Sequence, residues 1–341
     1  MNKIARLCIA LAFCHFGSCA ASAQPSPPAM TKVKIAQTSI ALSFGALAVA
    51  VDHGFFKKEG IEPDLQVMSG ADVAVLTALR TGSIQFAGMT MIPAMQAIAR
   101  GESLRLVSPL TQRFALQVLM NADAMKKYGI TEEMPMRERL ARVKGINIGT
   151  LDVGGGFHLI FKSMAREFGI NADQDYEITA IKSYAGLLTA VKRGDVGMAL
   201  TAIPFGTYGV QKEGLKFFAD LWSGDFPTYD GLYHLGLVTT ADIAKSDPEL
   251  VVRMNRAMSG ALKFMHEHPD QVLATMKKRY PDLSEELLSI FVVQDHASFA
   301  KDAKFEHRGF DMVKDFGAKG VIAKAAEIKY EDVVLPVARV P

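Results

Sequence analysis

The stretch VKIAQTSIALSFGALAVAVDHGFFKKEGIEPD, residues 33–64, decides the fold of this chain. A β-rich run at 33–37 leads into a polar loop, and the apolar run at 44–51 then predicts a helix. Gly54 and Gly60 suit the left-handed ends of two helical turns, and a second strand pattern follows. The stretch therefore predicts a strand–loop–helix–strand unit. Its polar loop lies at the carboxyl end of a strand, where α/β folds bind ligands.

The chain repeats this arrangement. Residues 76–93 and 188–204 both contain Leu-Thr-Ala, then a glycine, and end in Ile-Pro. Each segment predicts an amphipathic helix, a glycine stop, a short strand and a helix that begins near the proline. The preceding units also correspond, 34–51 in the first half to 146–168 in the second. Two copies of one βαβαβ unit predict an α/β protein with two similar lobes.

The sequence Gly-Phe-Phe-Lys-Lys-Glu-Gly-Ile at 54–61, after a strand, a polar loop and an apolar helix, carries a family resemblance. It resembles the opening of solute-binding proteins for nitrate, sulfonates, taurine and thiamine-pyrimidine compounds, which serve ABC importers. The resemblance covers roughly the whole chain after its leader. It implies a two-lobed periplasmic-binding-protein-like (type II) fold, in which each lobe is a doubly wound sheet flanked by helices and two hinge crossings join the lobes.

The expected organisation follows from the strand patterns and from this resemblance. A strand near 233–239 is assigned to the second lobe, and the pattern from 247 onward is helical and returns to lobe one. The hinges are expected near 111–114 and 239–241. The expected segments are a signal peptide at 1–23, a tether at 24–31, the first part of lobe one at 32–112, lobe two at 113–239, and the helical return segment of lobe one at 240–341.

The amino terminus predicts export. Lys3 and Arg6 precede a short apolar run at 7–16, and Ala-Ser-Ala at 21–23 fits a cleavage site, so we expect a periplasmic protein. The apolar run is too short to anchor the chain across a bilayer. Lipidation at Cys19 is the less favoured alternative, because the bulky Phe16 stands where such boxes usually carry leucine.

Composition excludes several classes of function. All three cysteines lie within the leader, so the mature chain has no disulfide, thiolate metal site or cysteine nucleophile. The formal net charge is +2, which gives no basic excess for nucleic acid. No second apolar run is long enough to span a membrane. We expect no metal and no cofactor, and a monomer whose partners are a small-molecule ligand, an ABC permease and its ATPase.

Loops at the carboxyl ends of the predicted strands supply the candidate ligand-binding residues. The sharpest is 152–158, because its three glycines let the backbone approach a ligand and lead into a helix whose first N–H groups attract anions. The candidates from all these loops are Thr38, Ser39, Ser43, Phe44, Ser69, Gly70, Met89, Thr90, Arg113, Gly154, Gly155, Gly156, Phe157, Tyr184, Thr201, Pro204 and Trp222.

Three of the side chains have two interpretations each. Arg113 either clamps a carboxylate or sulfonate bidentately, or forms a salt bridge at the hinge. His158 either donates to the ligand, or caps the helix or faces solvent. Trp222 either stacks on a ring of the ligand or packs within a lobe. Many relatives carry an acid before the proline that matches Pro204, and Ile203 in that position argues against an amine held there.

We therefore predict an exported receptor that captures a small organic anion, a sulfonate or carboxylate with an aromatic or heterocyclic body, and delivers it to an ABC importer. The alternative from the same superfamily is an enzyme similar to a thiamine-pyrimidine synthase. That enzyme depends on a cysteine cluster, and the mature chain has none. A receptor that feeds a membrane sensor is the third hypothesis.

Overall fold

The computed structural model describes residues 30–39, 41–68, 71–222, 229–294, 298–319 and 322–340. The predicted signal peptide, and the tether up to residue 29, lie outside the described residues. Thr31, predicted as the last residue of the tether, is the first residue of strand β1.

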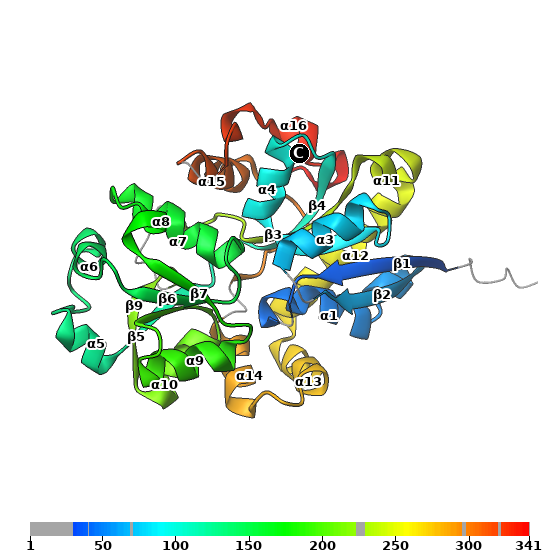
Figure 1. Cartoon of the computed structure of the whole chain (residues 1–341). Helices are drawn as coiled ribbons and strands as arrows, with labels where there is room; N and C mark the ends of the chain where they lie inside the picture. The colour runs from blue at the N-terminus through cyan, green and yellow to red at the C-terminus, as the bar shows by residue number, and fades with distance from the viewer. Residues whose placement is uncertain are drawn as a thin grey trace, which may run out of the picture.

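Two five-stranded mixed sheets form the frame of the molecule (Figure 1). The strand order is β2-β1-β3-β10-β4 in the first sheet and β7-β6-β8-β5-β9 in the second. In each sheet one antiparallel strand, β10 or β5, lies between two other strands. The strands are β1 (Thr31–Gln37), β2 (Ile61–Val67), β3 (Phe86–Thr90), β4 (Leu104–Thr111), β5 (Leu116–Asn121), β6 (Asn147–Thr150), β7 (Glu177–Ala180), β8 (Met198–Ala202), β9 (Leu215–Asp220) and β10 (Leu235–Thr240).

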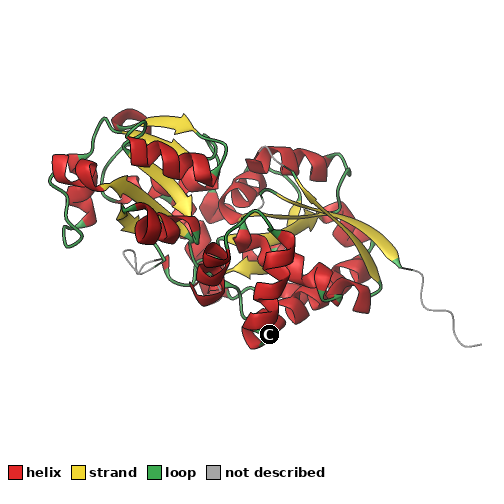
Figure 2. Ribbon diagram, turned by 90° about the horizontal axis from the view of Figure 1, so that it is seen from below, coloured by secondary structure: helices red, strands yellow, loops and turns green. Residues whose placement is uncertain are grey.

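Helices flank both sheets, as Figure 2 shows. The first-half helices are α1 (Gly45–Asp52), α2 (Phe55–Lys58), α3 (Ala71–Arg80), α4 (Met91–Ala99), α5 (Ala122–Lys127) and α6 (Met136–Arg142). The next are α7 (Gly156–Glu167), α8 (Ala172–Asp175), α9 (Tyr184–Arg193) and α10 (Phe205–Glu213). The C-terminal helices are α11 (Ala241–Ser246), α12 (Pro248–Glu267), α13 (Pro269–Arg279), α14 (Glu285–Gln294), α15 (His307–Ala318) and α16 (Tyr330–Val333). Short 3-10 helices are η1 (Leu42–Phe44), η4 (Ala325–Glu327) and η5 (Pro336–Ala338).

The predicted repeat is confirmed by the two sheets. Helix α3, strand β3 and helix α4 in the first half correspond to α9, β8 and α10 in the second. Gly54 and Gly60 have φ angles of +71° and +68°, so both are left-handed, as the sequence predicted.

Two strand assignments differ from the sequence prediction. The strand near 233–239 was assigned to the second lobe, but β10 pairs with β3 and β4 of the first sheet. The chain therefore changes sheets between β9 and β10, before this strand rather than near 239–241. Strand β9 was not predicted at all, because its six residues follow a short helix and show no clean alternation of buried and exposed positions.

The C-terminal helices contact both halves of the molecule. Helix α12 packs against α1, α2 and β4 of the first half. Helix α14 also packs against α10, and the Ser163 hydroxyl of α7 donates to the Phe316 carbonyl of α15 at 3.1 Å. The return segment therefore packs against elements of both sheets.

The buried apolar residues continue from one sheet to the other. Phe114 lies between β4 and β5, where the chain first crosses from one sheet to the other. Tyr229 lies between β9 and β10, where the chain returns to the first sheet, and Phe316 lies on α15. The Phe316 ring centroid is 5.2 Å from that of Phe114 and 4.9 Å from that of Tyr229. Aromatic edge contacts thus join both crossing segments to a C-terminal helix.

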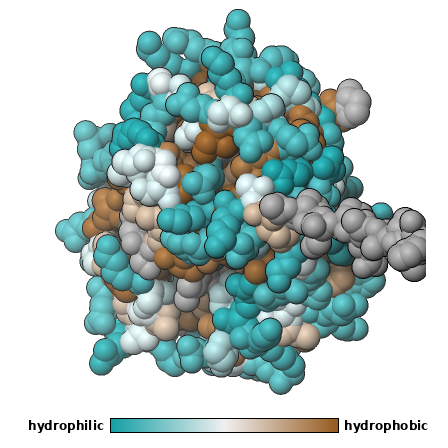
Figure 3. All heavy atoms as spheres, turned by 90° about the vertical axis from the view of Figure 1, so that its right-hand side faces the viewer, coloured by the Kyte–Doolittle hydropathy of each residue, from teal (hydrophilic) through white to brown (hydrophobic). Residues whose placement is uncertain are grey.

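The face in Figure 3 is mostly hydrophilic, with hydrophobic side chains visible only in small areas. Among the described residues, no helix is both long and apolar enough to cross a bilayer.

Candidate functional site

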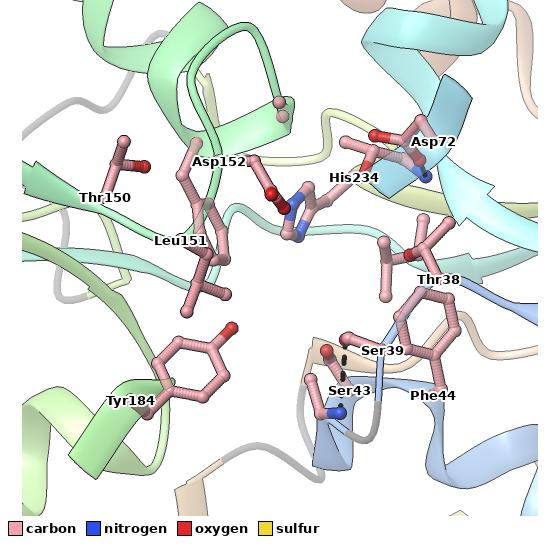
Figure 4. Close-up of a pocket in the computed structure, with 16 residues that line it drawn as sticks. Thr38, Ser39, Ser43, Phe44, Asp72, Thr150, Leu151, Asp152, Tyr184 and His234 are labelled. Atoms are coloured by element: carbon pink, nitrogen blue, oxygen red, sulfur yellow. Dashed lines mark hydrogen bonds between the residues drawn. The ribbon is translucent and has the colours of Figure 1, made fainter. Parts of the chain in front are cut away.

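A cavity of about 70 Å³ lies between the two sheets. It opens at the carboxyl ends of β1, β3 and β6, the edge at which α/β sheets bind ligands. Both sheets contribute to its walls (Figure 4). Its lining residues are Thr38, Ser39, Ala41, Ser43, Phe44, Asp72, Thr90, Thr150, Leu151, Asp152, Gly155, Gly156, Phe157, Tyr184, His234 and Leu235.

The loop after β1 forms one wall. The Gln37 side-chain amide donates to the Ser39 carbonyl at 2.8 Å, and the Ser39 hydroxyl accepts from the Ala41 N–H at 3.2 Å. These local bonds hold the small polar loop in place before η1 begins. The loop therefore presents hydroxyl groups to the cavity, with Phe44 as an apolar surface beside them.

The glycine loop before α7 forms the opposite wall. Gly154 is left-handed at φ +82°, and its N–H donates to Nδ1 of His158 at 2.8 Å. His158 thus holds the loop through its ring nitrogen, which differs from a cap on the helix. Gly155 is the N-cap of α7, and no side chain caps that helix. The N–H groups of Gly156 and Phe157 precede the first intrahelical hydrogen bonds, so they can donate to an acceptor in the cavity.

Aromatic side chains supply the apolar part of the cavity. Tyr184 stacks on Phe205 with ring centroids 4.3 Å apart and an interplanar angle of 9°. The Phe157 ring lies 5.7 Å from the His234 ring. In Figure 4 the Tyr184 side chain points its hydroxyl toward the cavity. A ligand in the cavity would meet aromatic rings as well as hydroxyl groups.

Asp72, in the first turn of α3, is the most buried acid of the site, with 6% of its surface exposed. Its carboxylate accepts from the Thr90 N–H at 3.2 Å, at the start of α4. The pKa of Asp72 is raised from 3.8 to about 7, chiefly by burial, with the hydrogen bonds from Thr90 opposing the rise and the nearby Asp152 adding to it. Because the folded pKa lies above the ordinary value, the protonated form stabilises the fold. That contribution is complete below about pH 4 and is lost as the pH rises through about 7.

His234 lies between the two walls, one residue before β10. It is 3% exposed, and burial lowers its pKa to about 3, so its imidazole is neutral. Its Nδ1 has no hydrogen-bond partner among the described residues. A buried polar atom of this kind normally finds a partner, so His234 is ready to hydrogen-bond a ligand in the cavity.

The two walls touch at Thr90 and Gly156. A Cβ atom built on Gly156 would lie 2.7 Å from the Thr90 Cγ2 and 2.9 Å from its hydroxyl oxygen. Thr90 ends a strand of the first sheet, and Gly156 begins a helix beside the second. The absence of a side chain at residue 156 thus permits this close approach.

The structure brings many of the predicted site residues together at the cavity and leaves others elsewhere. Those that line it are Thr38, Ser39, Ser43, Phe44, Thr90, Gly155, Gly156, Phe157 and Tyr184. Those outside its lining are Met89, Arg113, Gly154, Thr201, Pro204 and Trp222. Ser69 and Gly70 lie outside the described residues.

The residues outside the lining have structural contacts of their own. Met89 is fully buried in the hydrophobic core, and the Thr201 hydroxyl donates to the Gln117 carbonyl at 2.9 Å. Arg113 pairs with Asp230 at 3.0 Å, and its guanidinium lies over the Trp222 ring at 5.5 Å. Arg113 therefore makes the hinge salt bridge, the second of its two predicted roles.

Several residues that line the cavity were not among the candidates predicted from the sequence. Asp72, Thr150 and Asp152 follow or end predicted strands, so their position at carboxyl ends was the available signal. His234 and Leu235 carried no such signal, because their strand was assigned to the other lobe. Within the described ranges, no three or more His, Cys, Asp or Glu residues are grouped to hold a metal ion.

Arg113→Ala is expected to change ligand affinity by less than about fivefold. The pair with Asp230 has side chains 40% and 64% exposed, and such pairs contribute about 0–1 kcal/mol. Titration calorimetry with the best organic anion measures the change, and Asp230→Ala should give an equally small one. A loss above about thirtyfold for Arg113→Ala alone would place Arg113 on the ligand.

A curated protein to which this chain is similar is the putative binding protein YtlA of Bacillus subtilis (strain 168). It is 34% identical over 86 residues, which are 24% of this chain and 25% of the relative. The match thus spans about a quarter of the relative's length.

Solved structures match over most of the chain. A protein from Bordetella bronchiseptica RB50 superposes with a TM-score of 0.77 at 16% identity, over 89% of this chain and 94% of that one. The periplasmic aliphatic sulphonate binding protein SsuA of Escherichia coli superposes with a TM-score of 0.64 at 18% identity, over 86% of each chain. At these identities the likeness shows the fold, which is that of the periplasmic binding proteins and confirms the predicted fold class.

The profile of one protein family, described as NMT1/THI5 like, matches residues 42–272, which is more than half of the chain. That range contains most of the quoted opening stretch, the glycine loop that forms one wall of the cavity and both crossings between the sheets. The chain belongs to the NMT1/THI5-like family.

Proposed function

We propose that this protein is the solute-binding component of an ABC import system, and that it captures a small organic anion between two lobes. One observation carries the proposal: the cavity is lined from both sheets, at the carboxyl ends of their strands and at the uncapped start of α7. In the proposal two lobes move: the predicted unit 32–112 with the return segment and β10, and the predicted unit 113–239 without β10, which pairs with the first sheet. The E. coli SsuA protein, which shares the fold, is named for aliphatic sulphonate binding.

The anion would lie against the glycine loop. The free N–H groups of Gly156 and Phe157 and the hydroxyls of Ser39 and Ser43 are donors, and charge-assisted hydrogen bonds are stronger than neutral ones. The aromatic rings of Phe44, Phe157 and Tyr184 would cover a sulfonate or carboxylate's apolar body. These features support an organic anion over a bare inorganic one.

We also propose where the protein acts, which proteins it delivers its ligand to, and that it binds its ligand without converting it. The leader supports export to the periplasm as a monomer, where the loaded receptor would deliver its ligand to an ABC permease and its ATPase. We propose binding rather than catalysis, because the cysteine cluster on which the related synthase depends is missing from the sequence after residue 19. A receptor for a membrane sensor would use the same cavity, and uptake that depends on the permease distinguishes the two.

A thermal-shift panel of sulfonates, carboxylates, nitrate, pyrimidines and amines tests the proposal. At a ligand concentration a hundredfold above Kd, binding should add about 2.7 kcal/mol to the free energy of unfolding. Small-angle scattering on the stabilised sample should show a more compact particle than without ligand. Chemical conversion of the stabilising compound, or identical dimensions with and without it, would contradict a closing receptor.

A further inference from the structure

Two carboxylates from opposite walls face the same small cavity. Asp72 belongs to α3 of the first half, and Asp152 follows β6 of the second. Figure 4 shows both side chains directed toward the space beside His234. Among the described residues that line the cavity, none is lysine or arginine. Closure therefore concentrates negative charge where the proposed ligand binds.

The surrounding groups offset this charge only in part. Thr90, at the end of β3, donates to Asp72 at 3.2 Å, and His234, from the segment before β10, is neutral. Lys182, after β7, lies 3.6 Å from Asp152, but its side chain is 81% exposed and water screens it. Asp72 therefore meets hydrogen-bond donors of Thr90 and the charge of one further carboxylate, and the neutral imidazole of His234 lines the same cavity.

His234 provides an independent sign that a ligand completes this site. Its Nδ1 is buried without a partner among the described residues, and His234 lines the same cavity as both acids. A ligand nitrogen that carries hydrogens would satisfy an unprotonated Nδ1 and both carboxylates together. Water or an anion alone would leave the two carboxylates without an opposite charge.

We propose that Asp72 and Asp152 determine specificity by requiring a cationic nitrogen, a protonated amine or amidine, on the same ligand whose anionic group meets the glycine loop. The inference rests on the proposed function and narrows its ligand to a small zwitterion. The cation stabilises the closed form by lying between acids that otherwise repel each other across the closing walls.

The proposal has a pH signature with a definite sign. Asp72 is protonated in the empty cavity below about pH 7, and a bound cation favours its carboxylate. Binding therefore releases a proton, so the affinity for a zwitterion should rise with pH, by up to about tenfold per unit, until Asp72 is ionised in the free protein. An anion without the amine should show no such rise.

Two matched pairs of compounds test the proposal by titration calorimetry at pH 5 to 8. The pairs are 2-aminoethanesulfonate against 2-hydroxyethanesulfonate, and 3-aminopropanoate against 3-hydroxypropanoate, each differing in the amine alone. We expect an amino compound to bind at least tenfold more tightly than its hydroxy partner at pH 8, with a buffer-dependent enthalpy at pH 6 that reports proton release. A hydroxy compound that binds equally well or better overturns the proposal, and so does failure of all four to bind. The wider panel above still tests the proposed function in either case.

The Asp72→Asn variant removes the negative charge of residue 72 and is expected to keep the local fold. The asparagine side-chain oxygen can still accept from the Thr90 N–H, so α4 keeps its contact while the carboxylate is lost. We expect the ratio of affinities for the amino compound and its hydroxy partner to fall at least tenfold in this variant. Its affinity for the amino compound should not depend on pH between 5 and 8. Asp195→Asn, an exposed acid of the second half, serves as the control and should bind like the wild type. An Asp72→Asn protein that retains both the amino preference and the pH profile would overturn the proposal.

Discussion

Gly156→Ala is expected to lower ligand affinity by about 5- to 150-fold without unfolding either half of the protein. The added Cβ would lie 2.7 Å from the Thr90 Cγ2, across the cavity rather than within one lobe. Overpacking of this kind costs about 1–3 kcal/mol, and in the proposed closing motion it falls on the closed form. Calorimetry with the best ligand of the panel measures the loss, and scattering should show that the variant stays open.

A double-mutant cycle provides the control. Thr90→Ala removes the two atoms nearest the new Cβ and leaves the Thr90 Cβ at 3.2 Å, so it should relieve much of the clash. The double variant should bind nearly as well as Thr90→Ala alone. If Gly156→Ala lowers the ligand affinity equally in the wild type and in Thr90→Ala, closure does not bring these two residues together.

Phe316→Ala is expected to lower the free energy of unfolding by about 3–5 kcal/mol. Phe316 is 1% exposed, and its ring packs against Phe114 and Tyr229 at 5.2 and 4.9 Å. Its removal leaves a cavity where α15 meets both crossing segments. Urea unfolding monitored by circular dichroism measures the effect.

Asp315→Ala is the matched control, because this exposed neighbour lies on the same helix and surface substitutions usually stay within about 0.5 kcal/mol. A loss below about 1 kcal/mol for Phe316→Ala would show that the crossings do not depend on α15. An aromatic cluster that joins three distant segments should instead make the C-terminal helix part of one cooperative unit with them.

The residues around 54–61 and the repeat of 76–93 in 188–204 were sufficient to predict two α/β lobes. These signals are local, since hydrophobic period and glycine stops act within one element and its neighbours. Within the segment predicted to be helical, α13 (Pro269–Arg279) follows the same local rules, because a proline begins it and basic residues fill its last turn. Strand β9 lacked such a pattern and was missed.

The assembly of the site could be predicted only in part. Candidate loops followed from the rule that ligands meet the carboxyl ends of strands, and many of the predicted residues line the cavity. Arg113 shows the limit of that rule, because a position at a crossing does not decide where a long side chain points. It pairs with Asp230 instead.

The sequence by itself determined the α/β class, the duplicated unit and the loops from which a binding site can be built, because these depend on patterns between residues close along the chain. Only the tertiary structure decided which sheet receives β10, and with it the placement of His234 at the cavity. It also decided the charge of the site. In the sequence, Ile203 alone argued against a bound amine. In the structure, Asp72 and Asp152, which are 80 residues apart along the chain, line the same cavity. Burial and proximity are properties of the packed chain, and they turn two ordinary acids into a feature that no local pattern encodes.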